Sequence, residues 1–182
     1  MALMAMTEPE QAARTVQLAV AGDEYAFARI VAAYHDDLCR VAFVVCRDTD
    51  MAQEAVQEAW SICWRQLPRL RDPASLRGWL VAIAANQARQ VVRRTRRRSV
   101  RELELGGRHG SAVDDPAGRA GDMDLRNALG RLSAEDRSLL ALRYVAGVDA
   151  TELSRLTGLS PSGTRARLAR LLTTLRQELN DA

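Results

Sequence analysis

Residues 75–101 read SLRGWLVAIAANQARQVVRRTRRRSVR and combine an apolar helical pattern with a dense block of positive charge. The apolar positions expected on the inner face are Leu76, Leu80, Ile83, Ala84 and Val91. Most of them lie three or four residues apart, which is the spacing of one face of an α-helix. From residue 65 to residue 101 the chain carries eleven arginines and one acidic residue, Asp72. We therefore expect the positive charge to be mounted on a folded helix.

The charge of the chain is segregated along the sequence. Residues 1–64 carry four arginines and ten acidic residues, and residues 102–182 carry eleven arginines and twelve acidic residues. The formal net charge of +3 therefore conceals one strongly basic segment. Such a segment is typical of a surface that meets phosphate groups. The alternative is a solvated arginine face, which the density and one-sidedness of the charge disfavour.

Length and composition limit the class of protein. The 182 residues, of which 47% are hydrophobic, suit one ordinary domain or two small ones. No apolar run approaches the roughly 18 residues of a membrane span, and the N-terminus lacks the pattern of a secretory signal, so we expect a cytoplasmic protein without membrane insertion. The three cysteines, Cys39, Cys46 and Cys63, fit buried small hydrophobes, and no metal or cofactor is expected.

The periodicity predicts an all-α fold with two small helical domains. Helices are expected after Asp23, after Asp50 and after Ser75, each of these residues acting as the N-cap. The apolar period then fades, and residues 99–122 are expected to form a flexible linker. The domains are accordingly expected at residues 12–98 and 123–182. In the second one, Ser133, Asp149 and Ser160 are the expected N-caps.

The second domain contains the pattern of a helix-turn-helix motif. A short helix from residue 151 is followed by a turn at Gly158 and by a second helix that starts at Ser160 and Pro161. The residues expected to face outward on this second helix are Ser162, Ala166 and Arg170, with Arg165 and Arg167 on its flanks. Small outward residues let a helix enter the major groove, and arginines reach guanine edges or phosphates. The alternative is a plain helical hairpin with a basic face.

Motifs in both halves resemble the extracytoplasmic-function (ECF) sigma factors of bacterial RNA polymerase. The motifs are AQEAVQE at residues 52–58, LRGWL at 76–80, IAAN at 83–86, the pair Arg93 and Arg94, and TRARLAR at 164–170. The resemblance implies a sigma region 2 helical bundle followed by a sigma region 4 helix-turn-helix domain. It also implies a subunit that directs promoter recognition and melting in transcription initiation.

The resemblance assigns roles to particular residues. For binding the clamp coiled coil of core polymerase, it implies Gln53, Glu54, Gln57 and Glu58. For binding the minus-10 DNA, it implies Arg71, Ser75, Arg77, Asn86, Arg89, Arg93, Arg94 and Arg97. For binding the minus-35 DNA, it implies Ser162, Arg165, Ala166, Arg167 and Arg170. Trp79 shares the apolar spacing of the helix and is interpreted as a core residue.

The resemblance also implies three partners, which are core RNA polymerase, promoter DNA and an anti-sigma factor, and an association with the nucleoid when the chain is bound to polymerase. One alternative is a free-standing DNA-binding regulator that uses only the helix-turn-helix. A second alternative is an enzyme, but the segment GLSPS at residues 158–162 lacks the second glycine of a nucleophile elbow and follows no predicted strand. We therefore expect no catalytic residues.

Overall fold

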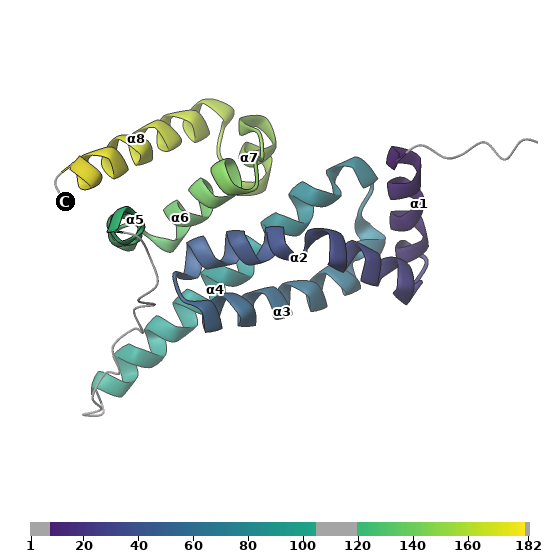
Figure 1. The fold of residues 1–182 in the computed structure, drawn as a ribbon, viewed down its shortest axis with the longest axis horizontal. Helices are drawn as coiled ribbons and strands as arrows, with labels where there is room; N and C mark the ends of the chain where they lie inside the picture. The colour runs from purple at the N-terminus through teal and green to yellow at the C-terminus, as the bar shows by residue number, and fades with distance from the viewer. Residues whose placement is uncertain (1–7, 105–119, 181–182) are drawn as a thin grey trace, which may run out of the picture.

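The computed structural model describes residues 8–104 and 120–180, with the side chains of residues 11–101 and 124–180. Over these ranges the regular elements are helices, as the all-α prediction required (Figure 1). The α-helices are α1 Glu8–Val20, α2 Glu24–Cys46, α3 Thr49–Gln66, α4 Leu76–Glu104, α5 Ala120–Arg131, α6 Ala134–Leu140, α7 Ala150–Thr157 and α8 Pro161–Asn180. Single turns, Leu67–Arg69 (η1) and Pro73–Ser75 (η2), join α3 to α4, and a π-helical turn, Ala141–Val145 (η3), follows α6.

The first four helices form one body, called here the N-terminal body. Helices α2, α3 and α4 pack along one another, and α1, which the sequence did not predict, packs against α2 (Figure 1). The buried face of α3 is made of small residues, namely Ala52, Ala55, Val56, Ala59 and Cys63. Small side chains let the neighbouring helices approach closely, so the few aromatic rings are left for the edge of the bundle. There Phe27 meets Trp60 edge-on at 5.9 Å between ring centroids.

Two predicted N-caps in this body are wrong. Asp48, and not Asp50, caps α3, because Asp48 has extended backbone and accepts a hydrogen bond from the amide of Met51 at 2.8 Å. Asp50 already lies within the first helical turn. Ser75 donates its hydroxyl to the carbonyl oxygen of Asp72 at 2.7 Å and belongs to the turn η2 that precedes α4. The cap at Asp23 is confirmed, since its carboxylate accepts from the amide of Ala26 at 2.9 Å.

Helices α5 to α8 form the C-terminal body, and its three predicted caps are confirmed. The hydroxyl of Ser133 accepts from the amide of Asp136 at 3.1 Å, and that of Ser160 accepts from the amide of Gly163 at 3.0 Å. The carboxylate of Asp149 accepts from two amides of α7. Gly158 adopts a left-handed conformation with φ 71°, which lets the chain turn sharply from α7 into α8. The helix-turn-helix therefore has the predicted construction.

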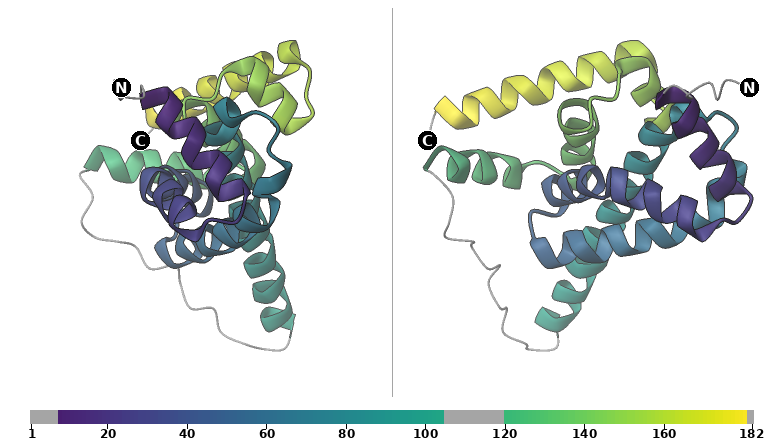
Figure 2. Two further views of the ribbon diagram at one scale, coloured as in Figure 1. Left: turned by 90° about the vertical axis from the view of Figure 1, so that its right-hand side faces the viewer. Right: turned by 45° about the vertical axis from the view of Figure 1, so that its right-hand side comes forward.

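The two bodies are packed together. Helix α6 and the turn η3 lie against α2 and α4, and the same neighbours appear in the turned views (Figure 2). Buried residues of the C-terminal body join the apolar cluster of the N-terminal body; they include Leu139, Leu140, Ala141, Leu142 and Ala146. Helix α4 runs on to Glu104 and α5 begins at Ala120, so both extend into the predicted linker at 99–122, and its residues 105–119 lie outside the described part of the chain.

The corrected cap of α3 gives a stability prediction. Asp48→Ala should lower the free energy of unfolding by about 1 to 2 kcal/mol, because the amide of Met51 loses its acceptor. Asp50→Ala removes the same charge but only its interaction with the helix dipole, about 0.5 kcal/mol. Asp48→Asn, which keeps a capping oxygen, should stay close to wild type. Urea unfolding followed by circular dichroism measures all three, and equal losses for the two alanine variants would contradict the cap assignment.

Candidate nucleic-acid interface

A groove lined by arginines follows the outer face of α4. Its lining residues are Asn86, Gln90, Arg93, Arg94, Arg97, Arg98 and Arg101, and they are called here the arginine groove. The opposite face of α4 contains Ala84, Ala88 and Val91, which are buried against the bundle. Their burial determines which side chains of α4 point outward. Four residues predicted for minus-10 DNA are brought together here: Asn86, Arg93, Arg94 and Arg97. The sequence analysis did not predict Gln90, Arg98 and Arg101. They continue the same spacing of three and four residues that led to the other four.

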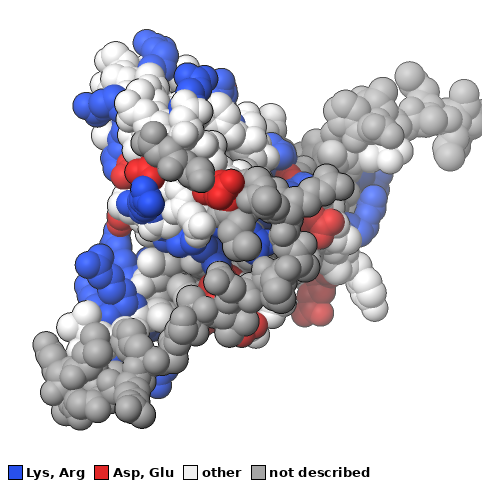
Figure 3. All heavy atoms as spheres, turned by 60° about the vertical axis from the view of Figure 1, so that its left-hand side comes forward, with Lys and Arg blue, Asp and Glu red and all other residues white. Residues whose placement is uncertain are grey.

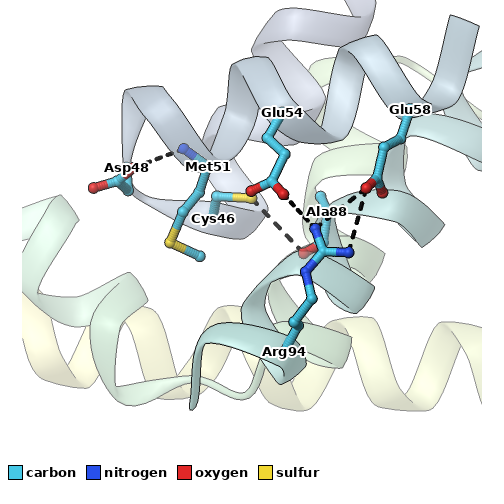
Figure 4. A network of polar contacts seen from close by, with 7 residues as sticks. All are labelled: Cys46, Asp48, Met51, Glu54, Glu58, Ala88 and Arg94. Atoms are coloured by element: carbon cyan, nitrogen blue, oxygen red, sulfur yellow. Dashed lines mark hydrogen bonds and ion pairs between the residues drawn. The ribbon is translucent and has the colours of Figure 1, made fainter. Parts of the chain in front are cut away.

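Arg94 connects this groove with α3. Its guanidinium lies between the carboxylates of Glu54 and Glu58 and bonds to both, at 3.2 Å in the case of Glu58 (Figure 4). The side chain of Arg94 remains 54% exposed, so the pairing takes place at the surface and not in the core. Glu54 and Glu58 belong to the four residues predicted to bind polymerase, called here the α3 ridge: Gln53, Glu54, Gln57 and Glu58. Gln53 and Gln57 are exposed.

Arg89 differs from its neighbours because it is half-buried. Its Nη2 donates to the side-chain oxygen of Asn86 at 3.2 Å, while its Nε is buried and has no hydrogen-bond partner in the described residues. Burial lowers the pKa of this guanidinium, since the charged form is partly desolvated. Arg89 is therefore bonded to one residue of the arginine groove, Asn86, and presents less of its charge to solvent than the exposed arginines of the groove.

The other predicted minus-10 residues lie apart from the groove, near the start of α4. Arg77 donates from Nε to Asp37 at 2.8 Å and from Nη1 to the carbonyl oxygen of Ala146. Partial burial acts to raise the pKa of Asp37, but hydrogen bonds from Arg40 and Arg77 hold this pKa below its ordinary value. Ser75 lines a hollow that it shares with residues of α7, and Arg71 is exposed in the preceding loop. The predicted set thus divides into two groups.

The second helix of the helix-turn-helix is α8, and it presents the predicted face. Ser162, Arg165, Ala166 and Arg170 are exposed, while Thr164, Leu168, Leu171 and Leu175 are buried. Arg167 is held within the C-terminal body, because its Nε lies 2.9 Å from a carboxylate oxygen of Asp136 on α6. Figure 3 shows basic side chains over the C-terminal body and again towards the end of α4, with acidic groups between the two places. On this face of the molecule the basic side chains therefore gather at the C-terminal body and at the end of α4.

The remaining sequence predictions concern Trp79, the cysteines, metal binding and membrane insertion. Trp79 is half-buried and packs against the core, in agreement with its interpretation. Burial raises the pKa of the Cys46 and Cys63 thiols to about 12, so both are protonated at neutral pH. Within the residues that the structure describes, no group of three His, Cys, Asp or Glu side chains is arranged to hold a metal ion. In the same part of the chain, every helix is too short or too polar to span a bilayer.

Comparison with known proteins gives matches over both bodies. The family described as Sigma-70 region 2 matches residues 30–98, and the family described as Sigma-70, region 4 matches residues 122–175. The chain is 30% identical over 173 residues to the ECF RNA polymerase sigma factor SigM of Mycobacterium tuberculosis, covering 88% of this chain and 84% of SigM. It is 32% identical over 176 residues to a protein of Xanthomonas campestris pv. campestris named "Probable RNA polymerase sigma factor RfaY". That match covers 88% of this chain but spans only 42% of the length of RfaY.

A solved structure shares the fold. The sigma factor RpoE, in its co-crystal structure with the anti-sigma factor NepR from Bartonella quintana, superposes with a TM-score of 0.69 at 21% identity. The superposition covers 85% of this chain and 96% of the RpoE chain.

The arginine groove gives a prediction about salt dependence. Arg97→Ala should weaken binding of single-stranded DNA, and the slope of log K against log salt should become shallower by about 0.7, the value for one lost phosphate contact. Fluorescence anisotropy over a salt series measures the slope. Arg29→Ala, which removes the same charge from an exposed site on α2, is the control and should leave the slope unchanged. An unchanged slope for Arg97→Ala would remove this residue from the groove's phosphate contacts.

Proposed function

The chain belongs to the extracytoplasmic-function sigma factors of the sigma-70 family, and from this premise we propose how its surfaces divide the work of promoter recognition. The arginine groove on α4 engages the unpaired strand of the minus-10 element. The exposed face of α8 reads the minus-35 element in the major groove. The α3 ridge binds the clamp coiled coil of core RNA polymerase. The family explains why one chain carries three such surfaces.

The observation that carries this proposal is the presence of two cationic surfaces on two separate bodies. The groove on α4 lines up arginines with Asn86 and Gln90, which supply hydrogen bonds beside the charge. That combination suits a single strand, whose phosphates are neutralised while its bases are held by polar groups. The face of α8 instead presents the small residues Ser162 and Ala166, which leave room for base edges. One surface suits melted DNA and the other suits duplex DNA.

The α3 ridge supports the polymerase contact. Gln53, Glu54 and Gln57 are exposed on one helix, while the opposite face of α3 is buried among small residues. A rigid helix with an exposed polar and acidic face is suited to docking on another helical element. The carboxylates of the ridge pair with Arg94 on the basic helix α4. We therefore assign the ridge to a protein contact and not to a DNA contact.

Three further features belong to the proposal. The chain itself catalyses nothing and acts by directing polymerase. It works in the cytoplasm and joins the nucleoid when it is bound to polymerase. An anti-sigma factor restrains it, as NepR is bound to RpoE in the solved complex.

Run-off transcription tests the proposed function. Core polymerase supplied with this chain should produce specific transcripts from a promoter of the native host, and core polymerase alone should not. Promoters are found by sequencing DNA that copurifies with the chain. Failure to bind core polymerase would overturn the proposal. Binding of a duplex operator at full affinity without polymerase would favour the free-standing regulator instead.

The polymerase contact predicts the effect of one substitution on α3. Gln57→Ala should weaken binding to core polymerase by about tenfold, the range of a central interface residue. Its free energy of unfolding should not change, because the side chain is exposed. Gln66→Ala, at the exposed end of the same helix, is the matched control. Titration of fluorescently labelled chain with core enzyme measures the dissociation constants, and equal values for the two variants would place the contact elsewhere.

The face of α8 predicts a loss of selectivity. In holoenzyme, Arg165→Ala should reduce discrimination against a one-base change in the minus-35 element by about 1 to 3 kcal/mol, if the guanidinium makes a bidentate base contact. Arg176→Ala, exposed further along α8, should leave discrimination unchanged. Competition binding with matched and changed promoters measures both. A uniform loss on all sequences for Arg165→Ala would mean that this arginine contacts phosphate only.

A further inference from the structure

We propose that a cavity between α1, α2 and the turn η2 binds a small amphipathic carboxylate, held by Arg29 at the rim and by an apolar floor. The cavity has a volume of about 570 Å³, which lies within the range of small-molecule sites in proteins. A protein partner needs a broader surface than a cavity of this size offers. None of the residues assigned to DNA or polymerase lines it, so the site goes beyond the proposed function.

The floor of the cavity is apolar and belongs to the core. Val16 of α1, Ile30 of α2 and Leu76 at the start of α4 line it, and each is at most 5% exposed. The walls carry small side chains, which leave the space between the elements open. These are Ala12, Ala13, Ala33 and Ala74. The apolar body of a ligand would therefore leave water by entering the cavity, which favours binding.

The rim of the cavity carries one cation, Arg29. Its side chain is exposed, and it forms no ion pair within the part of the chain that the structure describes. Among the described residues that line the cavity, none is acidic. A carboxylate accepts two parallel hydrogen bonds from a guanidinium, which makes it a well-matched anion for such a site. A molecule with an apolar body and a carboxylate head therefore fits both the floor and the rim.

The matched family segment does not include the whole site. The match to Sigma-70 region 2 begins at residue 30, so α1 and Arg29 lie before it. These two features supply one wall of the cavity and its cation. The site therefore depends on a part of the chain that the family match does not describe.

A ligand in this cavity would contact the turn that leads into α4. Helix α1 lies against α2 and against both single turns that precede α4 (Figure 2). Pro73 and Ala74 of η2 line the cavity. This turn is held by hydrogen bonds from the amides of Ala74 and Ser75 to Asp72, at 3.0 and 3.1 Å. A bound molecule bridges α1 and η2, and it should therefore slow the local opening of the turn.

Calorimetric titration with octanoate tests the site. The wild-type chain should bind free octanoate, below its micellar concentration, in a ratio of one to one. Acetate lacks the apolar body and octyltrimethylammonium reverses the charge of the head group, so neither should bind measurably. Equal binding of all three compounds would overturn the proposal. Binding that requires phospholipid vesicles would also overturn it, because the occupant would then be a membrane.

Two pairs of variants locate the site. Ala33→Leu fills the cavity and should abolish octanoate binding, whereas Ala32→Leu adds the same side chain at an exposed position of α2 outside the lining and should bind like wild type. Arg29→Gln should weaken binding by about tenfold, the range of one charge-assisted hydrogen bond. Arg65→Gln, at an exposed position of α3, is its control. Equal affinities within each pair would overturn the proposal.

Hydrogen exchange provides the second readout. Octanoate should slow exchange of the amides of Ala74 and Ser75 in the wild-type chain and not in Ala33→Leu. Unchanged exchange at these amides with octanoate bound would place the molecule elsewhere and overturn the site. Binding gained only when residues 1–7 are removed would also overturn it, because the chain itself would then fill the cavity. Neither readout uses DNA or polymerase, so failure of run-off transcription would count against the proposed function alone.

Discussion

The arrangement of the whole molecule depends on the guanidinium of Arg137 at the C-terminal end of α2. A buried charge is costly unless it is hydrogen-bonded, and the hydrogen bonds described for Arg137 all go to main-chain carbonyl oxygens, of Val45, Leu129 and Leu132. The carbonyl of Leu129 also accepts from the amide of Leu132, while that of Val45 lies at the end of α2, where carbonyls lack an intrahelical donor. Burial lowers the pKa of Arg137, and the nearby Arg47 acts in the same direction. One side chain thereby anchors α6, and α6 places Glu135 beside Arg93.

This anchor makes the contact between the bodies specific but not strongly stabilising. Removing a charge from water offsets much of what its hydrogen bonds contribute, so an interface built around a buried cation gains less free energy than an apolar one of equal area. The cation recovers its hydration when the bodies separate. The apolar residues around it, such as Leu139 and Leu142, favour packing. The contact between the bodies therefore combines one buried cation with apolar packing.

The sequence predicted the helices from α2 to α8, most of the caps and the inner faces, because those depend on local spacing and on residues next to one another in the chain. It did not predict α1. Asp48 and Asp50 show the limit of such reasoning, since both can cap a helix and only the backbone conformation at Asp48 decides between them. The packing of the two bodies was not predicted. Arg137 anchors this packing by bonding to main-chain carbonyls. Every residue has such a carbonyl, so no residue type in the sequence reveals the contact. One feature of the sequence could have indicated this anchor. Arg137 lies three residues before Leu140 and four before Ala141, which places it on the apolar face of α6.

The assignment of the individual site residues stays a prediction, and the structure adds a physical link between two of its surfaces. Arg94 of the arginine groove is held by Glu54 and Glu58 of the α3 ridge (Figure 4). A partner that draws these carboxylates away leaves the charge of Arg94 uncompensated and strengthens its attraction for phosphate. A phosphate that binds Arg94 first leaves two carboxylates exposed to a partner of α3. Coupling between two binding events is reciprocal, so the polymerase docking and the DNA binding proposed for these two surfaces would each favour the other through this one guanidinium.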